Sequence, residues 1–434
     1  MTLQLKELKT QNLMHWIDNP FGVLFDVRPL EAYNGWPLKG EVRGGHIKEA
    51  QAVPLKWTRY LDFKDILNSK QIKEDTPIIL YGYQVSDTEL LAKKLIKSGY
   101  KDIAVYHKFL EEWVNNKELP MDRLERFHHL VYPEWLKTLI DGVTPSEFHG
   151  KDYVICHSHY GYEQVYHDGH IPGAIPLNTN DLESTETWNR RSPEELEKVL
   201  LAHGISHDTT VIVYGRFNHP DNKDPYPGQA AGHLGAIRCA AILLYAGVKD
   251  VKILNGGLST WREAGYDVTT KPTRPVPKTN FGAKIPGRPD IFVDTPKAKK
   301  LLSSDKGELV SIRSWDEFIG NVSGYNYIEK KGRIPGAIFG NCGSDAYHME
   351  NYRNLDHTMR DYHEIKANWA ENGITPDKHI AFYCGTGWRG SEAFMNAYLM
   401  GWPKVSVYDG GWFEWSSDPE NPIEVGEPDG KQVL

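Results

Sequence analysis

One order of parts occurs three times along the chain, and this repetition constrains the fold more than any other feature of the sequence. Each copy has an apolar run, a Gly-rich turn, a second apolar run followed by a loop, and a closing apolar run. In the third copy these parts lie at residues 309–313, 332–337, 379–391 and 405–412. A period of this length is that of a domain rather than of a solenoid repeat, so the sequence predicts three similar domains.

Helical patterns separate the apolar runs. The clearest examples are residues 88–97 in the first copy, 193–202 in the second, and the stretch that starts at Ser391 in the third. Strands that alternate with helices are typical of parallel sheets covered by helices on both faces. The predicted fold class is therefore α/β, with three domains that each have a mostly parallel central sheet and helices on both faces.

The predicted boundaries follow from length and composition. A chain of 434 residues suggests about three domains at roughly 150 residues each. A Pro- and Lys-rich stretch without periodicity predicts an extended linker at 273–289. The expected domains are 1–125, 126–272 and 290–434. The polar residues 216–228 of the second copy are expected to form a surface loop, a disordered lid or a partner contact.

Composition excludes several classes of protein. The chain has 50 Lys and Arg against 58 Asp and Glu, so its formal net charge is −8, which argues against partners such as nucleic acid or anionic membrane. No apolar run is long enough to span a bilayer, and the N-terminus has no signal-peptide core. We expect a cytoplasmic protein, or a periplasmic one if a signal peptide has been removed from the sequence.

The four cysteines are widely spaced and form no Cys-x-x-Cys pair, so the sequence predicts neither a disulfide framework nor a zinc ribbon. Among them, Cys384 stands out because it follows the buried strand predicted at 380–383 and precedes a helix. A helix N-terminus offers unpaired N–H groups and favours an anion. Glycines at 385 and 387 allow close wrapping of the backbone, and Arg389 adds a positive charge. The loop is therefore predicted to hold a thiolate, or a sulfur-bearing form of it.

These motifs together resemble the rhodanese family. The resemblance is carried by an Asp-x-Arg after the first strand, the turn Gly-His-Ile-Pro-Gly-Ala at 169–174, the loop Cys-x-x-Gly-x-Arg at 384–389, and the closing Asp-Gly-Gly-Trp at 409–412. It covers nearly the whole chain, and the last two copies resemble the tandem-domain sulfurtransferases. The first copy is then an additional rhodanese-like domain. Only the third copy keeps a cysteine in its loop, so the first two domains are predicted to be inactive.

The resemblance implies a sulfurtransferase. Its thiolate, here Cys384, takes a sulfane sulfur from thiosulfate or 3-mercaptopyruvate, becomes a persulfide, and passes the sulfur to a thiophilic acceptor such as cyanide, a thiol or a protein. Two half-reactions of this kind are ping-pong covalent catalysis. No cofactor beyond the persulfide is implied, and the partners are the small donor and acceptor, with a sulfur-relay protein as a further possibility. The backbone of the residues after Cys384 would stabilise the anionic sulfur; these loop residues are Gly385, Thr386, Gly387, Trp388 and Arg389.

Two details of the third copy bear on the substrate. Arg313 matches the arginine of Asp-x-Arg and is a candidate for holding an anionic donor, although Ser311 stands where the family usually has Asp. Asp409 and Trp412 match the closing motif and are expected to brace the loop. The loop resembles Cys-Gly-Ser-Gly members that prefer 3-mercaptopyruvate, while Arg389 adds a charge suited to thiosulfate, so both donors stay open.

Other functions are weaker interpretations. Phosphatases built on the same domain have five residues between Cys and Arg, and this chain has four. A cluster of Cys156, His157, His159, His167 and His170 contains zinc-ligand residue types, but adjacent strand positions point in opposite directions, so no metal site is predicted. The alternative function is a sulfur carrier or binding scaffold that delivers sulfur to a partner protein with little free turnover.

Overall fold

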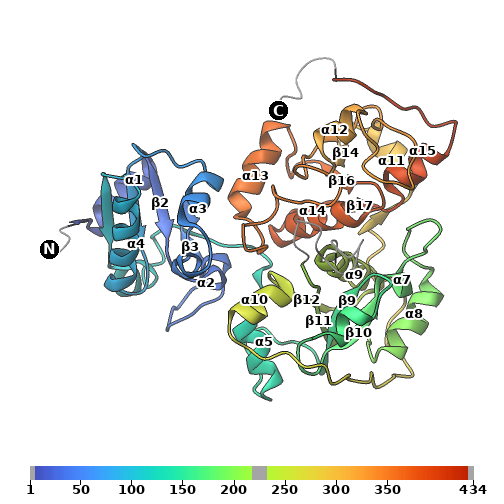
Figure 1. The fold of residues 1–434 in the computed structure, drawn as a ribbon, viewed down its shortest axis with the longest axis horizontal. Helices are drawn as coiled ribbons and strands as arrows, with labels where there is room; N and C mark the ends of the chain where they lie inside the picture. The colour runs from blue at the N-terminus through green and yellow to red at the C-terminus, as the bar shows by residue number, and fades with distance from the viewer. Residues whose placement is uncertain (1–4, 218–231, 429–434) are drawn as a thin grey trace. The chain divides into compact units, whose positions relative to one another are not determined.

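The computed structural model describes residues 5–217 and 232–428, so the loop expected at 216–228 lies almost entirely outside the described residues. The chain forms two compact units, Met1–His128 and His129–Leu434, and each is described by itself (Figure 1).

The first unit contains one five-stranded sheet in which every pair of neighbours is parallel. Its strands, in spatial order, are β1 (Lys6–Glu7), β6 (Ile103–Tyr106), β5 (Ile78–Tyr81), β2 (Val23–Asp26) and β4 (Ala50–Ala52). Its helices are α1 (Thr10–Asp18), α2 (Leu30–Asn34), α3 (Phe63–Ser69) and α4 (Val85–Lys97), with short helical turns η1 (Leu55–Arg59) and η2 (Phe109–Trp113). A separate antiparallel pair joins β3 (His46–Ile47) and β7 (Met121–Asp122).

The second unit contains two further five-stranded parallel sheets. A short helical turn, η3 (Phe127–His129), precedes them. The strands of the earlier sheet are β8 (Leu130–Val131), β12 (Asp250–Leu254), β11 (Thr209–Tyr214), β9 (Asp152–His159) and β10 (Ile175–Asn178). Its helices are α5 (Pro133–Ile140), α6 (Gln164–His167), α7 (Thr179–Leu182), α8 (Pro193–Ala202), α9 (Gly232–Ala246) and α10 (Gly257–Glu263).

The later sheet of the second unit carries the cysteine loop. Its strands are β13 (Phe292–Val293), β17 (Val405–Tyr408), β16 (His379–Tyr383), β14 (Gly307–Ser311) and β15 (Ile338–Phe339). Its helices are α11 (Thr295–Leu302), α12 (Trp315–Ile319), α13 (Tyr362–Glu371), α14 (Trp388–Leu399) and α15 (Gly411–Ser417). The central strand β16 is apolar and buried except at its first residue, as expected for a parallel strand covered on both faces.

All three sheets share one topology. When the strands of each sheet are numbered along the chain, the spatial order is 1-5-4-2-3 in every case. The repeat found in the sequence is therefore a repeat of structure, and the predicted α/β class with three mostly parallel sheets is confirmed. In each copy the loop of interest follows the fourth strand and leads into a helix, α4, α9 or α14.

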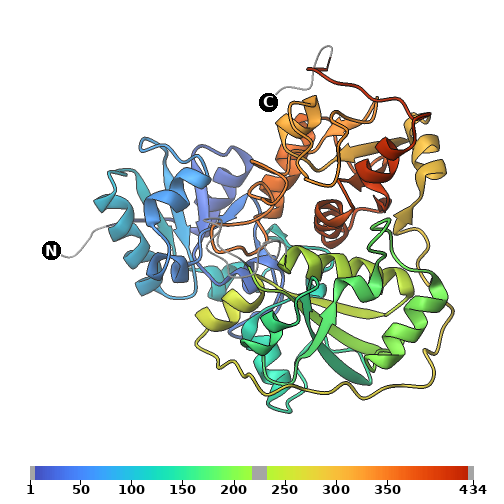
Figure 2. The ribbon, with the colours of Figure 1, turned by 45° about the vertical axis from the view of Figure 1, so that its right-hand side comes forward.

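Helices α9 and α14 lie against each other between the two sheets of the second unit (Figures 1 and 2). Every residue of both helices is buried. A helix that is buried on all sides has neighbours around its whole circumference, and here each helix packs on its own sheet and on the other helix. This contact brings the second copy next to the start of α14.

The predicted linker forms neither helix nor strand. It is bound to the second copy by backbone hydrogen bonds and buried side chains. The N–H of Lys278 donates to the Leu201 carbonyl at 2.9 Å, and the N–H of His207 donates to the Phe281 carbonyl at 2.8 Å. Phe281 and Ile285 are buried. Among the helices in the described residues, none combines the length and the apolar character that a membrane span needs.

The packing behind β16 gives a test of the fold. Trp369 is buried, its ring stacks on Phe382 at 5.1 Å, and its Nε1 donates to the Tyr352 hydroxyl at 2.8 Å. Trp369→Ala should lower the free energy of unfolding by about 3–5 kcal/mol, because it removes a large buried side chain. Val276 is 81% exposed, so Val276→Ala should change it by less than about 0.5 kcal/mol. Urea titration of both variants checks this; equal effects would contradict the packing described.

Candidate active site

Cys384 lies directly after β16, and α14 begins four residues later, at Trp388. The helix thus starts three residues earlier than the position predicted from the sequence, because Gly387 adopts a left-handed conformation with φ of 86° and caps it. Cys384 is fully buried. The loop of strand, cysteine, glycines and helix that the sequence predicts is present in this order.

The carbonyl groups of the loop are held by the start of α15. The N–H of Trp412 donates to the Cys384 carbonyl at 2.8 Å, and the N–H of Phe413 donates to the Gly385 carbonyl at 2.9 Å. Trp412 thus braces the loop as its motif suggests. Within the described part of the chain, no protein acceptor bonds the backbone N–H groups of residues 385–389. With the carbonyls engaged and the N–H groups available at a helix start, the loop is suited to an anion.

Tyr325 covers this loop, and sequence reasoning missed it. A Cβ added at Gly385 would lie 2.2 Å from Cε2 of the Tyr325 ring, so the ring packs directly on the glycine. The Tyr325 oxygen accepts a hydrogen bond from Arg389 Nη2 at 2.6 Å. Burial raises the pKa of Tyr325 well above its usual value despite Arg389, so the phenol keeps its proton. Because Arg389 donates to the oxygen, the O–H hydrogen is directed elsewhere and can donate to a bound group.

Arg389 is bound by a buried carboxylate. Its Nη1 and Nη2 both lie 2.9 Å from the Glu317 oxygens, and Nη1 also donates to Cys342 Sγ at 3.1 Å. Burial alone would raise the pKa of Glu317, but Arg389 and Arg313 lower it to about 2. Arg389 therefore carries a fixed positive charge whose position is set by Glu317.

Arg313 contacts one carboxylate and two backbone carbonyls. Its Nε lies 3.3 Å from Glu317 and its Nη1 donates to the Gly332 carbonyl at 2.7 Å. Its Nη2 donates to the Ser323 carbonyl at 3.3 Å, in the segment that carries Tyr325. A role in holding the donor stays a prediction for Arg313, and the geometry is that of a residue which orients Glu317.

The first copy explains the serine at position 311. There Asp26 ends β2 and binds Arg28, two residues later, with oxygens 2.6 and 2.9 Å from its nitrogens. In the third copy Ser311 ends β14 at the corresponding position, and Glu317 of α12 supplies the carboxylate for Arg313 instead. The negative charge that Asp26 supplies in the first copy thus comes from Glu317 of another element in the third copy.

Trp388 connects the loop to the second copy. Its indole Nε1 donates to Glu183 Oε1 at 2.7 Å. Its ring meets Tyr160 edge to face at 5.6 Å, and Tyr160 in turn contacts Trp188 at 5.8 Å. The loop is therefore bordered by side chains that belong to a domain without a loop cysteine.

A row of aromatic rings continues from there to Tyr325. Trp188 stacks on Tyr327 at 5.4 Å, and Tyr327 contacts Tyr325 at 5.2 Å. No sequence motif marks these residues, since they lie in irregular segments of two copies that only the tertiary structure brings together.

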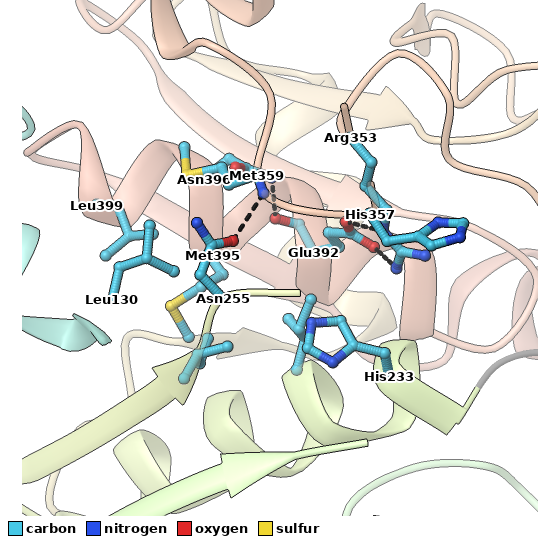
Figure 3. A pocket seen from close by; sticks show the side chains of 12 residues that line it. Leu130, His233, Asn255, Arg353, His357, Met359, Glu392, Met395, Asn396 and Leu399 are labelled. Carbon is cyan, nitrogen blue, oxygen red and sulfur yellow. Dashed lines mark hydrogen bonds and ion pairs between the residues drawn. The ribbon is translucent and has the colours of Figure 1, made fainter. Parts of the chain in front are cut away.

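A separate small cavity lies between α9, β12 and the second half of α14, and neither Cys384 nor its loop lines it (Figure 3). Its polar side chains are largely engaged with one another: Arg353 Nε donates to Glu392 at 2.7 Å, and the N–H of Met359 donates to Asn255 Oδ1 at 2.8 Å. Cys384 is followed by a loop whose N–H groups have no protein acceptor among the described residues, so it stays the candidate for the reactive cysteine.

Comparison with known proteins agrees with this geometry. The model of the Rhodanese-like domain matches residues 7–116, 133–264 and 294–418. The chain belongs to the rhodanese family of sulfurtransferases. The three matches correspond to the three sheets, so this rhodanese chain consists of three rhodanese-like domains.

One relative matches nearly the whole chain, and another matches part of it. Thiosulfate sulfurtransferase YnjE of Escherichia coli K12 is 41% identical over 98% of this chain and 92% of its own. Sulfur carrier protein TtuD of Thermus thermophilus is 32% identical over 61% of this chain and 88% of its own.

Similar solved structures include complexes with small molecules. Wild-type EanB has a TM-score of 0.95 and 53% identity, covering 98% of this chain and 99% of EanB. Substituted variants of EanB have been seen with hercynine, and with a cysteine persulfide and ergothioneine. An anaerobic ergothioneine biosynthesis enzyme from Chlorobium limicola, with its natural substrate trimethyl histidine, has a TM-score of 0.95 and 53% identity, covering 98% and 100% of the two chains.

The contact of Tyr325 with Gly385 can be tested by a double-mutant cycle. Gly385→Ala should lower the free energy of unfolding by about 1–3 kcal/mol, because its Cβ overlaps the ring. In a Tyr325→Ala background the same change should cost much less, since the obstructing ring is gone. Urea unfolding of the four proteins measures the coupling; equal costs in both backgrounds would show that the ring does not lie on the glycine.

The Glu317 carboxylate gives a pH test. Glu317→Gln should lower the free energy of unfolding near pH 7 by about 3–5 kcal/mol, because two buried arginines lose their counter-charge. Since the folded pKa of about 2 lies below the ordinary 4.5, this stabilisation is present above pH 4.5 and is lost as pH falls toward 2. Unfolding curves from neutral to acid pH should show the two proteins converging. The exposed Glu329→Gln is the control, and a gap that persists at low pH would refute the pairing.

Proposed function

We propose that this protein transfers a sulfane sulfur through a persulfide on Cys384. The observation that carries the proposal is the loop itself, in which a buried cysteine lies beside N–H groups that no protein acceptor uses within the described residues. A persulfide anion placed there would be stabilised by donors already in position. The roles expected of Gly385, Thr386 and Arg389 follow from the same geometry.

The loading step balances with either donor that the sequence suggested. With thiosulfate, the Cys384 thiolate attacks the outer sulfur, the S–S bond of the donor breaks, and sulfite leaves with the electron pair. With 3-mercaptopyruvate, the C–S bond breaks and the thiol proton is transferred to carbon, which gives pyruvate. In both cases the enzyme is left as Cys384–S–S⁻, in agreement with nucleophilic catalysis by a thiolate.

For the acceptor, we propose the imidazole of a trimethylated histidine. EanB, at 53% identity, has been seen with hercynine and with ergothioneine, which are the trimethylated histidine and its imidazole-2-thione. Trp188, Tyr160 and Tyr327 provide aromatic faces near the loop, and aromatic faces attract quaternary ammonium groups. The Tyr325 hydroxyl, which keeps its proton, can donate to a ring nitrogen.

The transfer step also balances. The imidazole carbon bonds to the outer sulfur of the persulfide, the S–S bond breaks, and Cys384 leaves as thiolate. The hydrogen of that carbon departs as a proton. The carbon is oxidised by two electrons and the sulfane sulfur is reduced by two, so no external oxidant is needed.

Two further candidates have specific support. The 41% identity to YnjE favours thiosulfate as donor with cyanide or a thiol as acceptor. The 32% identity to TtuD favours a sulfur carrier that delivers sulfur to a protein. All three candidates share the Cys384 persulfide and differ in the acceptor, so one experiment addresses them together.

The test is intact-mass spectrometry after incubation with thiosulfate or 3-mercaptopyruvate. Wild type and Cys342→Ser should gain one sulfur, whereas Cys384→Ser should gain none, because only the Cys384 loop stabilises the persulfide. Loaded enzyme is then offered hercynine or cyanide. Hercynine should remove the sulfur and yield ergothioneine, and Tyr325→Phe should slow this transfer much more than transfer to cyanide.

Each remaining outcome decides between the candidates. Discharge by cyanide but not by hercynine would favour the thiosulfate sulfurtransferase activity. A stable adduct that neither small acceptor removes would favour the carrier. An adduct that forms equally on Cys384→Ser would overturn the role of Cys384.

A further inference from the structure

A buried charge network joins the second copy to the cysteine loop. Arg238 of α9 is fully buried, and its Nε lies 3.0 Å from Glu183 and its Nη2 lies 2.6 Å from Asp409. The other oxygen of Glu183 accepts the hydrogen bond from Trp388 at 2.7 Å. A carboxylate and a guanidinium from a domain without a loop cysteine thus contact the loop at one end and the motif after β17 at the other.

Arg238 also lies against the loop backbone. A Cβ at Gly387 would be 3.1 Å from Arg238 Nη1 and 3.1 Å from the Asp409 carbonyl oxygen. Among the described residues, Arg238 Nη1 has no hydrogen-bond partner although it is buried. The guanidinium therefore fills the space beside the left-handed glycine that caps α14.

Asp409 extends this contact to the carbonyl side of the loop. It accepts from Arg190 Nη1 at 2.6 Å as well as from Arg238. It also directly precedes the segment whose N–H groups bond the Cys384 and Gly385 carbonyls. The second copy therefore fixes both the helix start and the brace of the loop.

We propose that Glu183 and Arg238 are positioning residues for sulfur transfer at Cys384, so that the second domain supplies part of the active site and the charge of Glu183 controls the transfer step. This inference rests on the proposed persulfide function. It assigns a role to a domain that has no nucleophile of its own in its loop.

The charge of Glu183 is set by its surroundings. The groups that face it are Arg238 of α9, the Asp409 carboxylate after β17, the Trp388 indole, Tyr160 of the second copy and the Cys239 thiol of α9.

Burial raises the pKa of Glu183, Arg238 and Trp388 lower it again, and the result is about 7. Ionised Glu183 balances Arg238 and accepts a charge-assisted bond from Trp388. Protonation removes the ion pair, so the restraint on Trp388 weakens as pH falls through about 7.

The experiment measures transfer in a single turnover. Wild type, Glu183→Gln, Glu183→Ala and Arg238→Lys are loaded with thiosulfate, the persulfide is counted by intact mass, and its discharge to cyanide is followed at several pH values on both sides of 7. Loading should be complete in all four proteins. Glu183→Ala should discharge more slowly, on the order of 10²-fold, because a misplaced loop loses the aligned geometry.

The pH profile separates positioning from mere stability. Glu183→Gln still offers Trp388 an amide oxygen but cannot titrate, so its rate should lack the additional fall below about pH 7 that wild type shows. Arg238→Lys should keep only part of the wild-type discharge rate, because an ammonium cannot bridge Glu183 and Asp409 in the same planar geometry.

A buried ion pair elsewhere in the same domain is the matched control. Asp250 and Lys252 of β12 are both buried and 2.9 Å apart. Asp250→Asn should reduce thermal stability yet keep the wild-type rate and pH profile.

Wild-type rates at every pH in the Glu183 variants would overturn this inference alone. Absence of a persulfide on wild type would instead overturn the proposed function. If Glu183→Ala does not fold, the profile of Glu183→Gln decides.

Discussion

The buried carboxylate of Glu317 is the interaction on which the rest of the active site depends. It binds Arg389 through two bonds of 2.9 Å and lies 3.3 Å from Arg313. It also accepts from the N–H of Ser314 at the start of α12. Arg389 in turn bonds Tyr325, whose ring covers Gly385. A single charge thus fixes a helix start, two cations and a phenol, because a buried ion is tolerated only when its partners are in place.

The carbonyl groups and the N–H groups of the loop have different roles. The N–H groups at the start of α15 engage its carbonyls, while its own N–H groups lie at the start of α14 without a protein acceptor in the described part of the chain. Such a site needs no reorganisation when negative charge develops on sulfur, which is the condition for strong electrostatic stabilisation. The loop thus lies between two helix N-termini: the start of α15 bonds its carbonyls, and the start of α14 offers N–H groups that suit an anion.

The second copy has no cysteine in its loop, yet its side chains contact the loop of the third copy. Its helix α9 is buried on all sides because it packs against α14. This contact places Arg238 and Glu183 beside the loop of the neighbouring copy. Burial makes these charges costly to desolvate, and in the low dielectric of the interior each charge also interacts more strongly with its neighbours.

The sequence by itself determined the repeat, the α/β class and the position of Cys384 between a strand and a helix. These features are local, since apolar periodicity, glycines and one cysteine are encoded within a few consecutive residues. The tertiary structure decided which partners reach that cysteine: Glu317 replaces the expected Asp, Tyr325 covers Gly385, and Glu183 arrives from another domain. Contacts of this kind join residues far apart in the chain and depend on how sheets and helices pack, so no short pattern records them.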